Sequence, residues 1–310
     1  MFRLPSPVLV FLACCLTLTP LAGCGAKKEP KTIASLLAKA KKNPKAEGRA
    51  RDLAKVAGMQ VDVKDKKGAV STLELAIAEI PADGQPLVCV PVLVEIAETY
   101  AQLGQRSSAK KVVESAVKLT AGLEDPLGRS QLLAQIGVVQ GSRDGGLGDS
   151  KAAEATLGEA AKLAGQNVAE RFRGKALAAV AMGYADAGLA DKAEGMIGTL
   201  EELAATLEEK RPKAEAFAAA AAVRASAGDK QAAAKLLDQA ASAAKGIDDL
   251  PANRVFALVA VAKALVANGD KKAATALLTD AEKSAAKVPD PQMQKDALKA
   301  VRMLQAKLKG

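Results

Sequence analysis

Histidine and tryptophan are absent from this chain of 310 residues, and its only aromatic residues are five phenylalanines, Tyr100 and Tyr184. Without histidine, the chain lacks the most common general base and metal ligand of proteins. With few aromatic and β-branched residues, it has little material for sheets. The apolar content of 49% comes mainly from alanine and leucine, which favour helices. We therefore expect an all-α protein.

Cysteine is also scarce, with four in the chain. Cys14, Cys15 and Cys24 lie near the N-terminus, and only Cys89 lies in the body of the chain, so no intramolecular disulfide is expected there. Cys89 stands in the apolar stretch PLVCVPVLV with no basic residue beside it. This setting predicts that the Cys89 side chain is buried as a small apolar group, and it disfavours a reactive thiolate. The alternative is that the Cys89 thiol forms a disulfide between two copies of the chain.

The N-terminal segment, positions 1–23, has the organisation of an export signal. Residues 1–3 are a short basic start, and residues 7–18 are an apolar run that is too short to span a bilayer. The stretch LAGC at residues 21–24 follows, and it resembles the bacterial lipobox, in which a peptidase cuts before a cysteine that carries diacylglycerol. The resemblance implies that Cys24 is the lipidated N-terminus of the mature chain. A plain secretory signal that is cut nearby is the alternative.

A lipid at Cys24 would anchor the protein to a membrane without spanning it. The chain has no later run of about 18 uninterrupted apolar residues, because Lys263 interrupts the best candidate. Gly25 stands where an aspartate would, by resemblance to enterobacterial sorting rules, retain a lipoprotein in the inner membrane. We therefore expect an exported protein that is attached to the outer membrane and faces the periplasm.

The formal net charge is +9, and part of the excess lies in the lysines of residues 26–31 and 41–45, beside the expected anchor. Lysines near a membrane favour an anionic headgroup surface. Elsewhere lysine and glutamate are interspersed, as on ordinary solvated helix faces. An exported chain with so few aromatics is a poor candidate for nucleic-acid binding, so no nucleic-acid partner is expected.

Five turn glycines recur at a nearly constant spacing. Gly104, Gly148, Gly188, Gly228 and Gly269 follow one another at intervals of about 40 residues, and such a period indicates stacked structural repeats. Small or branched apolar side chains stand at positions +5, +9 and +12 from each glycine, and a similar set precedes it. Spacings of 3 and 4 place each set on one helical face. Each unit is therefore expected to be a helical hairpin.

These hairpins resemble the tetratricopeptide repeat in their leucine and small residue on the first helix, their turn glycine and their alanines on the second helix. Tyr100 and Tyr184 fall on the tyrosine position of that family. The family's period is 34 residues, so each unit here carries about six more. The resemblance implies an α-solenoid of stacked antiparallel hairpins, with a period of about 40 residues and a C-terminal capping helix.

The solenoid is expected to contain five clear repeats and one degenerate repeat upstream, whose turn in residues 60–68 has no glycine at the turn position of the repeat. Asp290 and Pro291 predict the N-cap and the first residue of a final helix that covers the last hairpin. We divide the chain into a signal peptide (1–23), a lipidated N-terminus with a basic tether and first helix (24–46), the solenoid (47–289) and the capping helix (290–310).

Two sequence features suggest chemistry and are better explained by the repeat. Asp186 and Asp191 flank Gly188, but a Ca²⁺ site needs several carboxylates at alternating positions, so we interpret the aspartates at the repeat turns (Asp149, Asp191, Asp229 and Asp270) as caps or favourable charges at helix starts. Residues 141–150 are rich in glycine, but no strand precedes them and no Gly-Lys-Ser/Thr follows. They predict a flexible turn, with a contact loop as the alternative. We expect no catalytic residue, metal or cofactor.

In the tetratricopeptide family the first helices line a concave face that binds peptides. The resemblance implies ten concave-face candidates, which are Val94, Glu98, Ala134, Val138, Ala178, Met182, Ala218, Ala222, Val259 and Lys263. The set is mostly apolar, so the groove either binds an amphipathic helix or apolar peptide or is filled by neighbouring helices.

A basic residue recurs at the start of the first helix in four consecutive units. This basic edge consists of Arg129, Arg173, Lys213 and Arg254. Each residue either pairs with a linker carboxylate or the carbonyls that end the preceding helix, or joins a ladder that docks an acidic partner.

These features favour a non-catalytic, membrane-anchored scaffold that binds a protein or peptide partner in the bacterial cell envelope. The alternative is a periplasmic carrier or chaperone that holds apolar peptides or lipid in the concave groove. A scaffold would bind one defined partner, whereas a carrier would bind many unrelated apolar segments.

Overall fold

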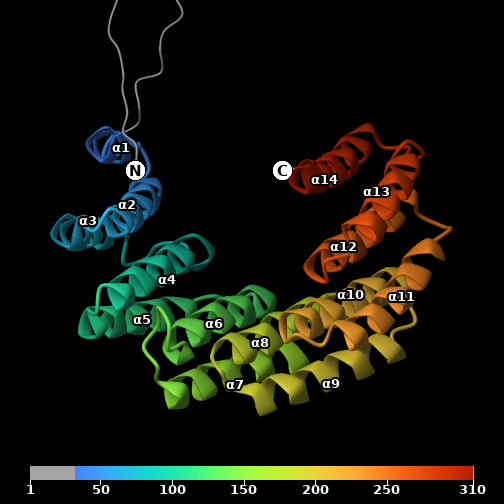
Figure 1. Cartoon of the computed structure of the whole chain (residues 1–310), viewed down its shortest axis with the longest axis horizontal. Coiled ribbons are helices and arrows are strands. Elements are labelled where there is room, and N and C mark those ends of the chain that lie inside the picture. The colour runs from blue at the N-terminus through green and yellow to red at the C-terminus, as the bar shows by residue number, and fades with distance from the viewer. Residues whose placement is uncertain (1–31, 310) are drawn as a thin grey trace, which may run out of the picture. The chain divides into compact units, whose positions relative to one another are not determined.

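The computed structural model describes residues 32–309, and every regular element in that range is an α-helix (Figure 1). The predicted export signal and Cys24 lie outside the described residues. The fourteen helices are α1 (Ile33–Ala40), α2 (Ala46–Asp62), α3 (Lys66–Ala78), α4 (Pro86–Gln102), α5 (Arg106–Thr120), α6 (Pro126–Gly141), α7 (Ser150–Gln166), α8 (Glu170–Asp186), α9 (Ala190–Thr206), α10 (Lys210–Ser226), α11 (Lys230–Lys245), α12 (Pro251–Ala267), α13 (Lys271–Ala285) and α14 (Pro291–Lys309).

The helices from α2 to α13 pair in chain order as six hairpins, α1 packs on α2, and α14 packs on both α12 and α13. We call α2, α4, α6, α8, α10 and α12 the first helices and their partners the second helices. Each first helix contacts the next first helix, whereas consecutive second helices make no backbone contact within the described residues (Figure 1). The first helices therefore form a continuous row, named here the first-helix row. The expected all-α solenoid of tetratricopeptide-like hairpins is confirmed.

The five turn glycines all adopt the left-handed conformation, with φ between +67° at Gly148 and +91° at Gly269. L-residues with a side chain rarely adopt these angles, because Cβ approaches the neighbouring carbonyl. The alanine at position +5 from each of these glycines is buried in the core, as the repeat predicts. The glycine period therefore reports the hairpin turns directly.

The hairpin α2–α3 has the degenerate turn. Lys64 stands one repeat period before Gly104 and has φ of +65°, and it is the one non-glycine with positive φ among the described residues. Asp65 follows it and accepts a hydrogen bond from the Gly68 backbone N–H at 2.9 Å. The turn therefore has the usual shape, but lysine occupies the glycine position at a conformational cost of about 1–2 kcal/mol.

Aspartates cap most of the second helices. Asp149, Asp229 and Asp270 each accept a hydrogen bond from the backbone N–H three residues later, as predicted. Asp191 lies instead inside the first turn of α9, where its charge favours the positive end of the helix dipole. Asp290 caps α14 in the same manner, through the N–H of Met293 at 2.6 Å.

The buried apolar residues form two clusters that meet at α6. One cluster extends from α1 to α6 and contains branched and aromatic side chains such as Ile96 and Tyr100. The other extends from α6 to α14 and is rich in alanine. In the alanine-rich part the helices approach closely, since a Cβ added at Gly183 would lie 2.7 Å from the Cδ2 atom of Leu157. Small residues therefore set the spacing of the later helices.

Candidate functional site

The ten concave-face candidates lie on the first-helix row but differ in exposure. Met182 and Lys263 are exposed, and Val94, Glu98, Val138 and Ala222 are half-buried. The other four are buried, and these are Ala134, Ala178, Ala218 and Val259.

The burial of Ala134 has a local cause. A Cβ added at Gly183 of α8 would lie 3.6 Å from the Ala134 Cβ, so the two first helices meet closely at this place. A partner therefore cannot reach Ala134 without separating α6 from α8. On this face Met182, 41% exposed, offers the more accessible apolar contact.

Two carboxylates lie half-buried on α4, one helical turn apart. Burial raises the pKa of Glu95, and the nearby Lys55 and Arg51 of α2 oppose that rise. Burial also raises the pKa of Glu98, and the neighbouring charge of Glu95 adds to the effect. Glu98 is a concave-face candidate, whereas Glu95 was not expected there. Its spacing of three residues from Glu98 is the signal that could have identified it.

The basic edge is largely tied into the solenoid. Lys213 donates from Nζ to the backbone carbonyl of Ala205 near the end of α9, at 3.1 Å. Arg254 donates from Nη1 to the carbonyl of Ile247 at 3.5 Å and lies 3.7 Å from the carboxylate of Asp248 in the linker. Both residues therefore make the structural contacts that were expected as the first alternative.

The other two basic-edge residues behave differently. Arg129 pairs with Glu159 on α7 at 2.5 Å, which is a partner outside the linker and the preceding helix. Arg173 makes neither kind of contact, and its buried Nε, like those of Arg129 and Arg254, has no hydrogen-bond partner among the described residues. Docking of an acidic partner along this edge stays a prediction.

A patch of arginine and aromatic residues lies at the N-terminal ends of α8, α10 and α12. The Arg171 guanidinium lies 4.7 Å from the ring centre of Phe172, which is 40% exposed. The Arg211 guanidinium lies 5.2 Å from the ring centre of Phe256 and donates to Asn253 at 2.9 Å. Arg171 and Arg211 both stand six residues before the large core residue of their helix, and this repeat register is the signal that could have found them.

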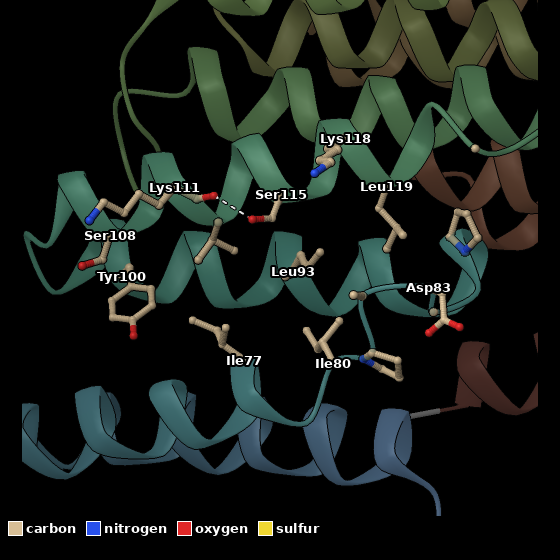
Figure 2. Close-up of a pocket in the computed structure, with 16 residues that line it drawn as sticks. Ile77, Ile80, Asp83, Leu93, Tyr100, Ser108, Lys111, Ser115, Lys118 and Leu119 are labelled. Carbon is tan, nitrogen blue, oxygen red and sulfur yellow. Dashed lines mark hydrogen bonds between the residues drawn. The ribbon is translucent and has the colours of Figure 1, made fainter.

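A pocket of about 790 Å³ opens between the end of α3, the α3–α4 loop, α4 and α5 (Figure 2). Leu93 and Tyr100 of α4 form part of its floor, and Ile77 and Ile80 line the side nearest α3. The volume lies within the range of small-molecule sites, which is about 300–1,000 Å³. The pocket is separate from the predicted concave-face positions, and the repeat pattern did not indicate it.

Two other predictions concern single features. Cys89 is 1% exposed and burial raises the pKa of its thiol, so the predicted burial of this side chain as a small apolar group is confirmed.

In residues 141–150, the backbone N–H groups of Leu147 and Asp149 donate to the carbonyls of Val139 and Gln140 at 2.8 and 2.7 Å. Because these amides are used within the turn, they are not free to bind a phosphate.

Within residues 32–309, no group of three or more Cys, Asp or Glu side chains is arranged to hold a metal ion. The same range contains no helix with the length and apolar character needed to cross a bilayer.

Comparison with known proteins gives remote structural similarity. No protein-family model matches the chain, and no curated protein matches it. The chain is similar to a structure of nearly identical TPR-like repeats named for a kinesin light chain of Podosopora anserina, with 23% identity, coverage of 66% of this chain and 97% of that chain, and a TM-score of 0.35.

Two further solved structures resemble the chain at lower identity. BtubC (BKLC) from P. vanneervenii is 16% identical, with coverage of 84% of this chain and 96% of that chain and a TM-score of 0.37. A Rap protein complexed with competence and sporulation factor is 14% identical, with coverage of 89% of this chain and 80% of that chain and a TM-score of 0.34. The fold assignment rests on the helical hairpins of the chain itself, which form a tetratricopeptide-like α-solenoid.

Proposed function

We propose that this chain is a non-catalytic scaffold that binds a protein or peptide partner in the bacterial cell envelope, and that a lipid on Cys24 anchors it to a membrane. The observation that carries the scaffold is the continuous first-helix row, in which each hairpin adds one helix beside the last. Stacked repeats of this kind provide an extended surface whose positions recur from unit to unit.

The exposed part of the row favours a partner with a mixed footprint. Met182 offers a flexible apolar side chain, which adapts to varied partner surfaces. Lys263 and the half-buried Glu98 add charges of both signs on other helices of the row. An amphipathic helix or a folded domain with apolar and charged contacts would match these groups.

The non-catalytic assignment is supported by the chemistry of the chain. It contains no histidine, and its body cysteine, Cys89, is buried with a raised pKa, which disfavours the thiolate. Anchoring is supported by the basic start, the short apolar run and the LAGC stretch that ends at Cys24. Attachment to the outer membrane, facing the periplasm, is part of the same proposal.

Site-specific photo-crosslinking in cells tests the scaffold. A photoreactive residue at position 182 reports on the first-helix row, and the same residue at position 199 is the matched control, because Thr199 is exposed on the second helix of the same hairpin. We expect one or two stoichiometric envelope proteins to crosslink from position 182 and not from position 199. A broad, substoichiometric mixture of exported proteins would favour the carrier instead.

Fractionation of cells tests the anchor separately. Cys24→Ser should move the protein from the membrane fraction to the soluble exported fraction, because the thiol that carries the lipid is replaced. Cys89→Ser is the control and should leave the protein on the membrane. Retention of the Cys24→Ser variant in the membrane would refute lipid anchoring and leave the crosslinking result standing.

A further inference from the structure

The pocket beside α5 is a trough with an apolar floor. Pro86, Leu93 and Tyr100 of α4 all line it, and their spacing of seven residues places them on one helical face. The rise of an α-helix makes this floor about 21 Å long. Ile80 lines the trough from the side of α3 and Leu119 from the side of α5. The trough can therefore hold an elongated apolar chain.

The trough exists because α3 ends early. With 13 residues, α3 is shorter than the other second helices, which have 15 to 17. In the later hairpins the residue sixteen positions after the turn glycine is a fully buried alanine, such as Ala204 or Ala244. The equivalent residue here is Ile80, which follows the end of α3, is half-buried and lines the trough. The space that alanine packing closes elsewhere stays open.

Polar groups gather at one end of the trough (Figure 2). Tyr100, Ser108 and Lys111 are placed together at this end, and Asp83 lies at the opposite end. Tyr100 is 3% exposed as a residue, but its hydroxyl oxygen is not among the buried unpaired polar atoms of the described residues, so it remains accessible from the trough. Figure 2 shows this hydroxyl pointing away from α5 into the space towards α3. A hydroxyl that faces the trough can donate a hydrogen bond to a ligand with an acceptor oxygen.

Two lysines line the α5 side of the trough. Lys111 and Lys118 form no ion pair with any residue in the described range, and their spacing of seven places them on one face of α5. Ser115, between them, donates its hydroxyl to the Lys111 carbonyl at 3.1 Å. No other second helix has lysine at both equivalent positions; α11, for example, has Lys235 and Ser242. The basic pair is therefore particular to the hairpin that contains the trough.

Acidic groups near the trough define the orientation of a ligand. Burial, together with the nearby Glu74 of α3, raises the pKa of Tyr100, so its hydroxyl stays protonated and can donate a hydrogen bond. Glu74 is exposed and would oppose an anion at this end, whereas Lys111 would attract one. Asp83 would repel an anion at the far end. An anionic head would therefore lie beside Tyr100 and Lys111, with its apolar chain directed along Leu93.

We propose that this trough binds a free single-chain anionic amphiphile of the long-chain fatty acid class. The carboxylate accepts hydrogen bonds from Tyr100 and Lys111, and the acyl chain lies between Ile80, Leu93 and Leu119. The aliphatic stem of Lys118 covers the chain while its ammonium group remains in water. This site is independent of partner binding on the first-helix row.

The test is a titration of the purified full chain, carrying Cys24→Ser so that no attached acyl chain competes, with the fluorescent fatty acid cis-parinaric acid. We expect saturable binding that palmitate displaces and hexadecanol, which has no charge, displaces poorly. Lys111→Glu should weaken binding at least about tenfold, and Tyr100→Phe about fivefold, because each removes a hydrogen bond to the carboxylate. Glu74→Gln should strengthen binding about twofold, because it removes a repulsive charge.

The matched control is Lys235→Glu, which makes the same charge change at the equivalent position of α11 and should leave binding unchanged. Circular dichroism shows whether each variant folds. If Lys111→Glu does not fold, Tyr100→Phe decides the test, because it keeps the aromatic ring and removes only the hydroxyl. Equal weakening by Lys111→Glu and Lys235→Glu would overturn the site, since it would indicate a general charge effect. Binding only to phosphatidylglycerol vesicles, or only to an acidic amphipathic peptide, would also overturn it.

Discussion

The hairpins before α6 and those after it solve the same packing problem with different residues. The earlier hairpins place branched and aromatic side chains such as Ile96 and Tyr100 between their helices. The later ones use alanine and glycine, so their backbones approach closely. Close backbone packing fills the space between hairpins, whereas larger side chains and a short α3 leave a trough. The same repeat pattern therefore allows close packing between the later hairpins and an open trough between the earlier ones.

Truncating one leucine in each region should reveal the largest difference in stability between the two regions. Leu157 is fully buried against Gly137 and Gly183, so Leu157→Ala should lower the free energy of unfolding by about 3 kcal/mol, because a cavity remains. Leu119 is half-buried beside an existing trough, so Leu119→Ala should cost about 1 kcal/mol. Urea unfolding followed by circular dichroism measures both. Equal losses would contradict the contrast between the two regions.

Added methyl groups should have opposite effects in the two regions. A Cβ at Gly141 would lie 2.5 Å from the Ala187 Cβ and 2.9 Å from the Ala153 Cβ, so Gly141→Ala should destabilise the fold by about 2 kcal/mol. At Gly58 in α2 a Cβ meets nothing within 4 Å, so Gly58→Ala should stabilise the fold by up to about 1 kcal/mol. Thermal unfolding of both variants measures the signs. A stable Gly141→Ala variant would mean that the later helices are not closely packed.

The hairpin turns offer a comparison with a smaller effect. Lys64 adopts a left-handed conformation without the benefit of glycine, so Lys64→Gly should relieve strain. Glycine also increases the entropy of the unfolded chain, so the expected net gain is only about 0.5 kcal/mol. The reciprocal variant Gly228→Lys, at φ of +87°, should cost about 1–2 kcal/mol. If Lys64→Gly instead lowers stability, the lysine side chain contributes contacts that offset its strain.

The hairpins could be predicted from sequence because their signals are local. A turn glycine such as Gly188 needs positive φ, and the alanine five residues later must fit between two helices, so both recur with the period. The burial of Cys89 was predicted for the same reason, since an apolar run surrounds it.

The exposure of the first-helix row could not be predicted in the same way, because it depends on how neighbouring repeats meet. The family resemblance placed Ala134 on an accessible face, but the approach of Gly183 buries it. The trough depends on the residue at which α3 ends, and helix ends are weakly marked in sequence. Ile80 is an ordinary apolar residue by type and lines the trough only because the helix stops before it.

Acid titration offers the subtlest test of the earlier region. Burial raises the pKa of Glu98 in the folded state, and the adjacent Glu95 raises it further. Between the unfolded and the folded pKa the folded chain binds more protons than the unfolded chain, so this group makes stability fall as pH rises through that window. Glu98→Gln removes the penalty, so the variant should be more stable than the parent chain at pH 7. Below the unfolded pKa of glutamate, which is about 4.3, the Glu98 carboxyl group is protonated in both the folded and the unfolded chain, so the advantage of the variant should vanish. Urea midpoints at pH 7 and pH 3 measure the difference. An advantage that persists at pH 3 would show that side-chain packing, and not the buried charge on the first-helix row, separates the two chains.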